Sequence, residues 1–594
     1  MTTAWMVKTA ERHDVCKEGG EQQLHRAADP RHGRVSPKRR FGQTASAAAL
    51  LLGVLPSVDD AADLEHEEGL AGMYDVIVVG AGSAGAPLAA RLSEDPSRRV
   101  LLLEAGRDWR SAEAPHAMRS ANIIPFMYDP AHQAQWQWPG LMTRRTAVQE
   151  PKFYWRGKAL GGSSAVNAQI AIRGVPAAFD AWAEAGCEGW SAAALMPIFD
   201  AIEDDADAGS APGVRRGGPL PVYRMPVAEW GAVDLAFRDA ALASGYRWKA
   251  DLNAPEGEGI SCNPINSRGG MRVTTNDAYL EPVRGRPNLT IRGGALVDRV
   301  LFEGKTARGV RVRFEGHAEC EEIAGAEVVL SAGAIHSPCI LMRSGIGPAR
   351  DLAALGIAVL QDAPAVGRHF IDHPIVRASI ALKPDYVARG DDARHTNCCL
   401  TYSSGLGGGG ERDMIMVAYN HRGLLVDGKP STNGAIGVAL YDAFSEGELR
   451  LVSADPEAQP IVDENMLADP RDRLRLRDGA RRVARLTARP ELADLATSIN
   501  FGETRLSMQE AAALPDDELD VVMLEQASDG QHAAGTCRMT AHEDPRGVVD
   551  PELNVRGVQG LRVADASIMP TDCRANLHFT CVMIGERLAR LMQA

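Results

Sequence analysis

The sequence lacks the cysteine arrangements that mark a metal centre or a redox motif. Its ten cysteines include no C-x-x-C pair, and no cysteines and histidines stand at the spacing of zinc ligands. The adjacent Cys398 and Cys399 indicate packing or a loop position rather than a disulfide. We therefore expect no metal site, and the cysteine pattern fits a reducing compartment.

Long apolar runs and an excess of basic residues are also lacking. The apolar stretch of small residues at 45–55 is too short to cross a membrane, so we expect no transmembrane anchor. The formal net charge of -14 argues against a nucleic-acid partner and against binding to an acidic membrane surface. The composition is that of a globular enzyme, and 594 residues predict two or more domains.

Residues 1–72 are polar and mixed in charge, unlike a folded domain. Arg39, Arg40 and Phe41 weakly resemble a twin-arginine export signal, which would imply a periplasmic protein. The pair begins far from the N-terminus, and no clear small-x-small cleavage site follows it. We predict a disordered or spurious extension, a true start at Met73, and a cytoplasmic protein.

A βαβ pattern begins directly after this extension. Residues 74–79 and 100–103 are short apolar runs that predict buried strands, and residues 86–92 between them predict a helix. A G-x-G-x-x-G motif occupies residues 80–85, at the turn between the first strand and the helix. Glu104 follows the second strand, about 20 residues after the motif, as in dinucleotide-binding units.

Each glycine of this motif has a physical role. Gly80 allows the tight turn, Gly82 lets the backbone approach a pyrophosphate, and Gly85 lets the helix pack on the strand. The start of the helix offers N–H groups and a partial positive charge to phosphates. Glu104 can accept the ribose hydroxyls, so the unit predicts an ADP-containing dinucleotide. The alternative is a glycine turn in another α/β fold.

A second segment rich in small residues, 155–167, indicates backbone pressed against something flat. It resembles the first signature of the glucose–methanol–choline family of flavin oxidoreductases. Further stretches match that family in order along nearly the whole chain after the extension. They are residues 333–338 and 344–348, 366–373, 532–539, 561–570 and 576–587.

The resemblance implies an α/β fold with two domains. One is a Rossmann-like FAD-binding domain, discontinuous in sequence, for which we expect residues 73–187, 256–350 and 526–594. The other is an α+β substrate-binding domain, with an antiparallel sheet covered by helices, for which we expect residues 188–255 and 351–525. The sequence predicts strands at 414–419, 436–441 and 449–452, and a helix with a solvated, charged face at 469–487.

The resemblance also implies how FAD is held. Val166 stands where some members attach the flavin through a histidine, so we expect non-covalent FAD. Val297 is expected beside the adenine, although a plain core position is the alternative, and Asn167 near the reactive edge of the isoalloxazine. The implied cofactor-binding residues are Gly80, Gly82, Ser83, Ala84, Gly85, Glu104, Ala105, Arg156, Leu160, Gly161, Gly162, Ser163, Asn167, Val297, Ala332, Gly333, Asp565 and Ala566.

Three residues are candidates for catalysis. By resemblance, His532 faces the flavin and takes the proton of the substrate hydroxyl, while the flavin N5 accepts a hydride. Asn576 stands about ten residues before Gly585 and is expected to hydrogen-bond the substrate oxygen. The segment after Asn576 departs from the family pattern, so His578 is a second candidate for this role.

We therefore predict an FAD-dependent oxidoreductase that converts the CH–OH group of a small alcohol to a carbonyl. The electron acceptor is oxygen, a quinone or another carrier, and the protein is a monomer or homodimer. Three alternatives are a hydroxynitrile-lyase-like enzyme with structural FAD, a non-catalytic dinucleotide-binding protein, and an NAD-dependent Rossmann dehydrogenase.

Overall fold

The computed structural model describes residues 73–205, 207, 216–255, 257–421, 425–426, 429–430 and 432–593. The predicted extension at 1–72 lies outside the described residues. The described residues all belong to the compact unit that spans residues 71–594.

The first sheet confirms the predicted βαβ unit. Strand β1 (Tyr74–Val79) pairs in parallel with β2 (Val100–Leu103) and with β14 (Cys320–Leu330), and helix α2 (Gly85–Leu92) connects β1 to β2. The strand order is β11-β2-β1-β14-β13-β12, and β26 also pairs with β14. The remaining strands are β11 (Leu289–Arg292), β12 (Ala295–Glu303), β13 (Thr306–Phe314) and β26 (Leu561–Val563).

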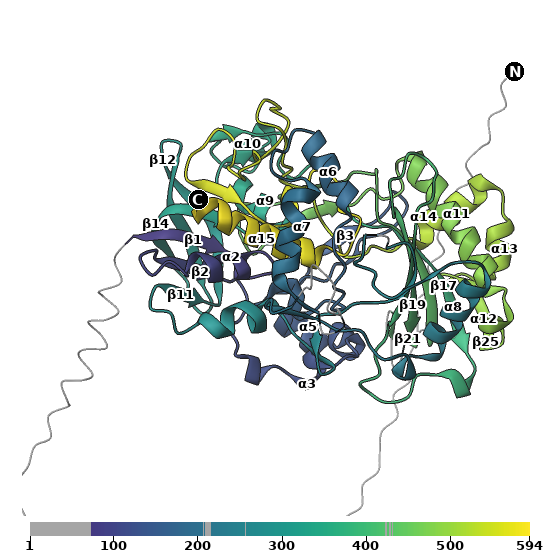
Figure 1. The fold of residues 1–594 in the computed structure, drawn as a ribbon. Helices are drawn as coiled ribbons and strands as arrows, with labels where there is room; N and C mark the ends of the chain where they lie inside the picture. Colours follow the sequence, from purple (N-terminus) through teal and green to yellow (C-terminus); the bar gives the residue numbers. More distant parts are fainter. Residues whose placement is uncertain are drawn as a thin grey trace, which may run out of the picture. The chain divides into compact units, whose positions relative to one another are not determined.

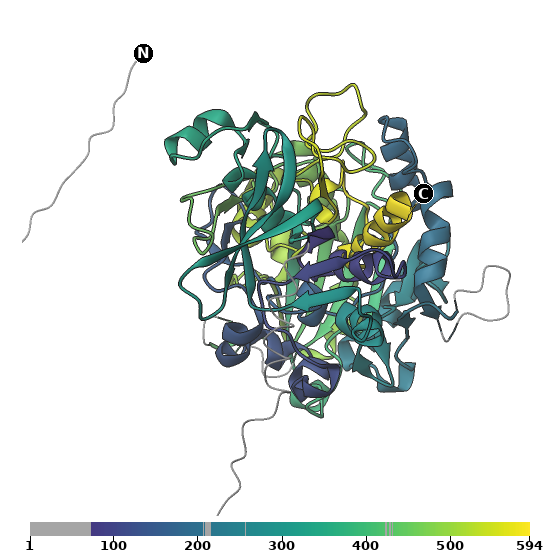
Figure 2. The same ribbon diagram turned by 90° about the vertical axis from the view of Figure 1, so that its left-hand side faces the viewer.

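Segments far apart in sequence meet around this sheet. The C-terminal helix α15 (Leu577–Gln593) lies beside α2, and the two are linked where Arg91 donates to Glu586 (Figures 1 and 2). Helix α9 (Gly333–Arg343) begins directly after β14 and packs near β12. Because β26 adds to the same sheet, the FAD-type fold is discontinuous, as expected.

The second sheet is the predicted antiparallel one. Its order is β25-β17-β22-β19-β18-β8-β7, and every pair is antiparallel except β7 with β8. Helices α8 (Ala232–Ala243) and α11 (Pro470–Thr487) cover it (Figure 1). The strands are β7 (Trp248–Lys249), β8 (Gly259–Cys262), β17 (Ile375–Leu382), β18 (Cys398–Tyr402), β19 (Met414–Asn420), β22 (Gly434–Leu440) and β25 (Ala496–Phe501).

A small four-stranded sheet, in the order β23-β24-β3-β4, accounts for the strand predicted at 449–452. Its strands are β3 (Met142–Arg144), β4 (Lys152–Phe153), β23 (Glu448–Arg450) and β24 (Ile461–Asp463). The other principal helices are α4 (Ile124–Tyr128), α5 (Pro130–Trp136), α6 (Pro176–Glu184), α7 (Ala192–Ile202), α10 (Ala349–Ala354), α12 (Pro490–Ala493), α13 (Met508–Ala513) and α14 (Asp516–Gln526). In the part of the chain that is described, none of the helices has both the length and the apolar character needed to cross a membrane.

Two hydrophobic cores suggest refined domain boundaries. Helix α7 contributes Leu195 and Phe199 to the core under the first sheet, whereas β8 contributes Ile260 to the core under the second sheet. We therefore propose that the FAD-binding domain takes in α7 and that the boundary predicted at residue 256 lies after β8.

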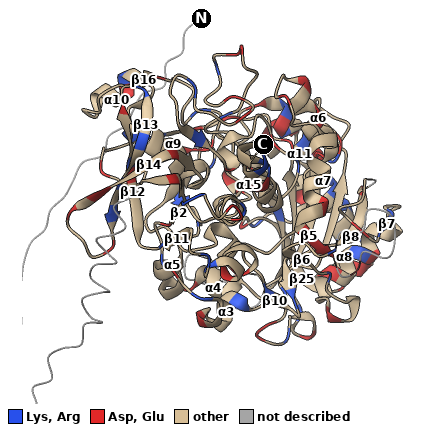
Figure 3. Ribbon diagram, turned by 60° about the vertical axis from the view of Figure 1, so that its left-hand side comes forward, with Lys and Arg blue, Asp and Glu red and all other residues tan. Residues whose placement is uncertain are grey.

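The prediction of a solvated helix at 469–487 is correct for the helix but incomplete for its face. Arg475 of α11 is fully buried and pairs with Asp413 and Asp472, at 3.3 and 2.6 Å. Leu476 and Ala480 are buried on the same face, while Arg471 is exposed. The many charged residues in the sequence of α11 made its apolar face hard to recognise. Elsewhere basic and acidic residues are interspersed along the ribbon (Figure 3).

Replacing Arg475 with methionine is expected to lower the free energy of unfolding by about 3–5 kcal/mol, because two buried carboxylates lose their partner. Replacing Arg471 on the same helix with methionine is expected to cost less than about 1 kcal/mol, since Arg471 is exposed to water and its ion pair with Asp469 lies at the surface. Urea unfolding followed by circular dichroism compares the two. Equal losses would contradict the assignment of a structural role to Arg475.

Candidate active site

A cavity of about 360 Å³ is lined by residues of both large sheets. From the first sheet come the β1 turn, Glu104 after β2, and Val297 of β12. From the second come Ile415 of β19 and Ala439 of β22. A space enclosed by two domains is the usual position of a cofactor and substrate site.

The glycines of the first turn have the tight contacts expected of the motif. A Cβ on Gly85 would lie 1.9 Å from the carbonyl oxygen of Gly80, so only glycine allows this packing. By contrast, a Cβ on Gly82 would lie 3.8 Å from its nearest neighbour, the Cα of Gly162. Gly82 is thus not required by the protein's own packing, which fits a position reserved for a ligand.

The second small-residue segment packs against this turn. Gly161 donates its backbone N–H to the carbonyl of Ala81 at 2.8 Å. Gly162 lies so close to Gly82 that a Cβ there would meet the Gly82 Cα at 2.6 Å. The two segments predicted to enclose the cofactor are therefore in direct backbone contact.

Two buried carboxylates organise the cofactor side of the cavity. Glu104 accepts the N–H groups of Ala81 and Gly106 at 2.9 and 2.8 Å, and burial raises its pKa to about 7 against the effect of these bonds. Asp565 accepts the N–H of Gly333 at 2.9 Å and the hydroxyl of Ser337 at 2.6 Å, and burial raises its pKa as well. Each carboxylate links two segments of the predicted cofactor site.

Most of the predicted site residues line this one cavity. Gly85, Leu160 and Gly161 do not; they pack behind the lining residues. Those that line it are Gly80, Gly82, Ser83, Ala84, Glu104, Ala105, Arg156, Gly162, Ser163, Asn167, Val297, Ala332, Gly333, His532, Asp565, Ala566, Asn576 and His578.

His532 and Asn576 are brought together at the cavity wall. The Nδ2 atom of Asn576 lies 3.1 Å from Nε2 of His532. The Asn576 Oδ1 atom accepts the hydroxyl of Tyr441 at 3.0 Å. Burial, with the nearby His373 and Arg156, holds the pKa of His532 well below its ordinary value, so this imidazole is neutral at physiological pH.

His578 occupies a different position on the same segment. Its Nδ1 atom lies 2.8 Å from Oγ of Ser83, at the first glycine turn, and burial lowers its pKa to about 4. The residue that contacts His532 is therefore Asn576, whereas His578 contacts the first glycine turn. The structure thus separates the two candidates left open by the sequence, and the role of Asn576 stays a prediction.

Other partners of His532 were missed from the sequence. The Nδ1 atoms of His373 and His532 lie 2.8 Å apart, and the His373 Nε2 atom is hydrogen-bonded to Asp572. His373 ends the stretch 366–373 that matched the family. That match was the available signal, although it assigned this histidine no role.

Asp372 and Tyr154 hold the backbone around His532. Both carboxylate oxygens of Asp372 accept the His532 N–H at 2.9 Å, and one also accepts the N–H of Gly530 at 3.2 Å. The Tyr154 hydroxyl donates to Asp372 and accepts the N–H of Ala533. The segment 530–533 is thus fixed by side chains from two distant parts of the chain.

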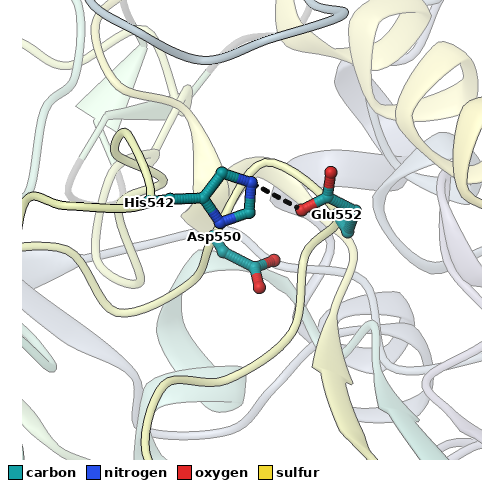
Figure 4. Close-up of side chains that lie close together, drawn as sticks. All are labelled: His542, Asp550 and Glu552. Atoms are coloured by element: carbon teal, nitrogen blue, oxygen red, sulfur yellow. Dashed lines mark ion pairs between the residues drawn. The ribbon is translucent and has the colours of Figure 1, made fainter.

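One group of side chains outside the cavity could offer metal ligands. Among the described residues, His542, Asp550 and Glu552 bring one ligand atom each within 4.8 Å of one another (Figure 4). His542 pairs with Glu552 at 3.2 Å, and Asp550 accepts hydrogen bonds from Asn554. Two of the three are exposed, so an exposed ion pair explains the group without a metal.

Comparison with known proteins identifies the family. Two models described as GMC oxidoreductase match residues 74–375 and 443–585. The chain belongs to the GMC oxidoreductase family. This confirms the predicted α/β fold, FAD as the cofactor, and an oxidoreductase that acts on CH–OH groups.

Several characterised relatives cover nearly all of the described chain. A 5-(hydroxymethyl)furfural oxidase from Methylovorus sp. (strain MP688) is 35% identical over 87% of this chain and 98% of its own. Choline oxidase from Arthrobacter globiformis is 34% identical over 88% and 94%. The solved pyridoxine 4-oxidase from Mesorbium loti has a TM-score of 0.76 at 31% identity, covering 88% and 99%. These relatives give no support to the lyase and NAD-dependent alternatives.

Substituting Gly82 and Gly85 with alanine separates the ligand contact from the fold. Gly82→Ala is expected to leave thermal unfolding of the apoprotein within about 0.5 kcal/mol of the parent, but to weaken FAD binding. Gly85→Ala is expected to destabilise the apoprotein itself, because of its backbone clash. Calorimetry and titration with FAD followed by flavin fluorescence test both. Parental FAD affinity in Gly82→Ala would contradict the prediction that Gly82 lies against the cofactor.

Proposed function

We propose that this protein oxidises a primary alcohol to an aldehyde, with His532 as the base and Asn576 as the group that holds the substrate oxygen. The observation that carries the proposal is the pair formed by His532 Nε2 and Asn576 Nδ2, 3.1 Å apart, on the cavity that the glycine turn also lines. A neutral imidazole is suited to take a proton.

The residues that line the cavity support a place for the cofactor. The turn at Gly80–Gly85 and Gly162 would hold the pyrophosphate, and Glu104 the ribose. Val166, which lines the cavity, has no group able to bond the flavin covalently, so we propose non-covalent FAD. When bound, FAD supplies the acceptor for the two electrons that leave the alcohol carbon.

The substrate's hydroxyl would bind against the pair formed by His532 and Asn576, in place of the contact that their side chains make with each other. An amide N–H from Asn576 holds the alcohol oxygen in reach of Nε2, so that the hydroxyl proton passes to the imidazole as the carbon is oxidised. Asp372 keeps the backbone of His532 in place during this transfer. The buried surroundings exclude water from the developing charge.

The wall of the second domain suits an uncharged, aromatic alcohol. It presents Tyr419, Ile415 and Val417 of β19 to the cavity, and Trp155 of the FAD-binding domain lines the cavity as well. Among the described lining residues, the carboxylates are Glu104 and Asp565, and both are already held by backbone N–H groups. A cationic substrate would be buried without a counter-ion, which costs several kcal/mol.

The names of two relatives support the same class of substrate. The 5-(hydroxymethyl)furfural oxidase and pyridoxine 4-oxidase are named for alcohols that carry a heteroaromatic ring, and both are named oxidases, which favours oxygen as the acceptor. We propose aromatic or heteroaromatic primary alcohols as substrates and oxygen as acceptor. The cytoplasmic location and the oligomeric state stay predictions.

Replacing His532 with alanine is expected to lower kcat by about 10²- to 10⁴-fold, because general base catalysis is lost. Bound FAD should remain, since His532 is not part of the cradle. Steady-state oxidation of benzyl alcohol and the flavin absorbance of the purified variant are the two measurements. A yellow variant with parental kcat would refute His532 as the base.

Alanine at Asn576 and at His578 should give different defects. Asn576→Ala is expected to lose about 10²-fold in kcat/KM per bound flavin, through misplacement of the substrate oxygen. His578→Ala is expected to weaken FAD retention and to change turnover per flavin less. The reverse pattern would assign the substrate oxygen to His578.

Substrate preference tests the uncharged wall. Benzyl alcohol or 5-hydroxymethylfurfural is expected to exceed choline by about 10²-fold or more in kcat/KM, given the cost of an unpaired cation. Val417→Glu should reduce this difference in kcat/KM. Val417→Gln, in which the new side chain has the shape of glutamate without its charge, should leave the difference unchanged. Choline as the better substrate of the parent protein would contradict the proposed class.

A further inference from the structure

Five side chains, three of them buried, form one hydrogen-bonded chain across the cavity wall. Tyr441 bonds to Asn576, Asn576 to His532, His532 to His373, and His373 to Asp572. His373 is inaccessible to solvent, Asp572 is 3% exposed, and the ring of Tyr441 stacks on His373 at 4.4 Å. Of the five residues in this hydrogen-bonded chain, the proposed mechanism uses only His532 and Asn576.

Only one proton can lie between the Nδ1 atoms of the two imidazoles. Two Nδ1 atoms 2.8 Å apart share a hydrogen bond only if one is protonated and the other has its lone pair free. If His532 carries the proton on Nδ1, its Nε2 lone pair faces the substrate. If His373 carries it, neutral His532 must be protonated on Nε2, which cannot then accept a proton.

Asp572 decides between these two arrangements. An ionised carboxylate accepts a hydrogen bond, so a neutral His373 beside Asp572 must carry its proton on Nε2. Its Nδ1 is then an acceptor, and the proton between the rings belongs to His532. Tyr441 favours the same direction, because its hydroxyl donates to Asn576 Oδ1 and turns the Nδ2 donor toward His532 Nε2.

We infer that His373, oriented by Asp572, is a positioning residue that sets the tautomer of His532 and switches it off when His373 becomes protonated. This inference rests on the proposed function for its kinetic consequence. Its structural part, the tautomer of His532, is independent of any substrate.

The charges around His373 set the pH at which this residue gains a proton and His532 is switched off. Burial lowers the pKa of His373, but Asp572, Asp372 and Asp442 outweigh burial and raise it above the ordinary histidine value. The other neighbours, His532 and Tyr441, carry no charge at neutral pH. A protonated His373 donates its own Nδ1–H, and His532 is then held in the inactive form. Activity should therefore fall with acidification as His373 gains a proton, although His532 itself titrates at lower pH.

Two measurements test the inference, with Asp572→Asn as the variant and His421→Asn as the control. His421 is another buried histidine, which stacks on Tyr419 and is outside the hydrogen-bonded chain. The first measurement is ¹⁵N NMR of FAD-loaded protein labelled on histidine, with His532 assigned by its loss in a His532→Gln sample. The second is the pH profile of kcat and KM with benzyl alcohol.

At mildly alkaline pH, the parent and His421→Asn should show His532 protonated on Nδ1 and not on Nε2. Asp572→Asn should show Nε2 protonation, a kcat lowered by about 10²- to 10⁴-fold with a much smaller change in KM, and an acid limb moved to lower pH. His421→Asn should keep the parental acid limb.

Protonation of His532 on Nε2 in the parent protein would overturn the inference. So would Asp572→Asn with a parental tautomer, or with parental kcat and acid limb. If no alcohol is oxidised by any sample, the proposed function fails, while the NMR spectra still decide the tautomer.

Discussion

The buried carboxylate of Asp372 is the constraint on which the catalytic side of the structure depends. It accepts the N–H groups of Gly530, His532 and its own neighbour His373. Between the first two lies Gln531, a non-glycine residue with φ of 62°. Such a conformation costs about 1–3 kcal/mol and persists only where its surroundings hold it. Asp372 supplies that hold, and the ring of His532 is directed into the cavity as a result.

The same principle applies on the cofactor side. Glu104 and Asp565 are buried carboxylates, and each accepts a backbone N–H from a segment that is distant in the sequence. Each group of donors lowers the cost of burying the carboxylate, and each carboxylate fixes a turn. The cavity is thus organised by side-chain-to-backbone bonds rather than by surface ion pairs.

Local patterns predicted the elements well. The runs at 74–79 and 100–103 became β1 and β2, because a continuous apolar run in a βαβ unit is buried on both faces. The motif was also placed at the turn that follows β1, where the packing of Gly80 and Gly85 leaves no room for a side chain, whereas Gly82 has room for one. The buried face of α11 was missed, because Arg475 is a charged residue whose partner Asp413 lies far along the chain, directly before β19.

Contacts between distant residues could not be predicted in this way. Tyr154 and Asp372 are 218 residues apart, and His373 and Asp572 are 199 apart. Residue type and spacing carry no information on such pairs, so the partners of His532 emerged only from the fold. Asn576 was predicted from its spacing to Gly585, which is local because Asn576 directly precedes α15, and preferring it to His578 as the partner of His532 needed the observed contact.

The most direct test of the account is anaerobic mixing of the purified, FAD-loaded protein with benzyl alcohol in a stopped-flow spectrophotometer. The account predicts that the flavin absorbance bleaches without oxygen in the parent protein and does so at least about 10²-fold more slowly in His532→Ala. Bleaching at the same rate in both would contradict it, as would parent protein that remains colourless when supplied with FAD.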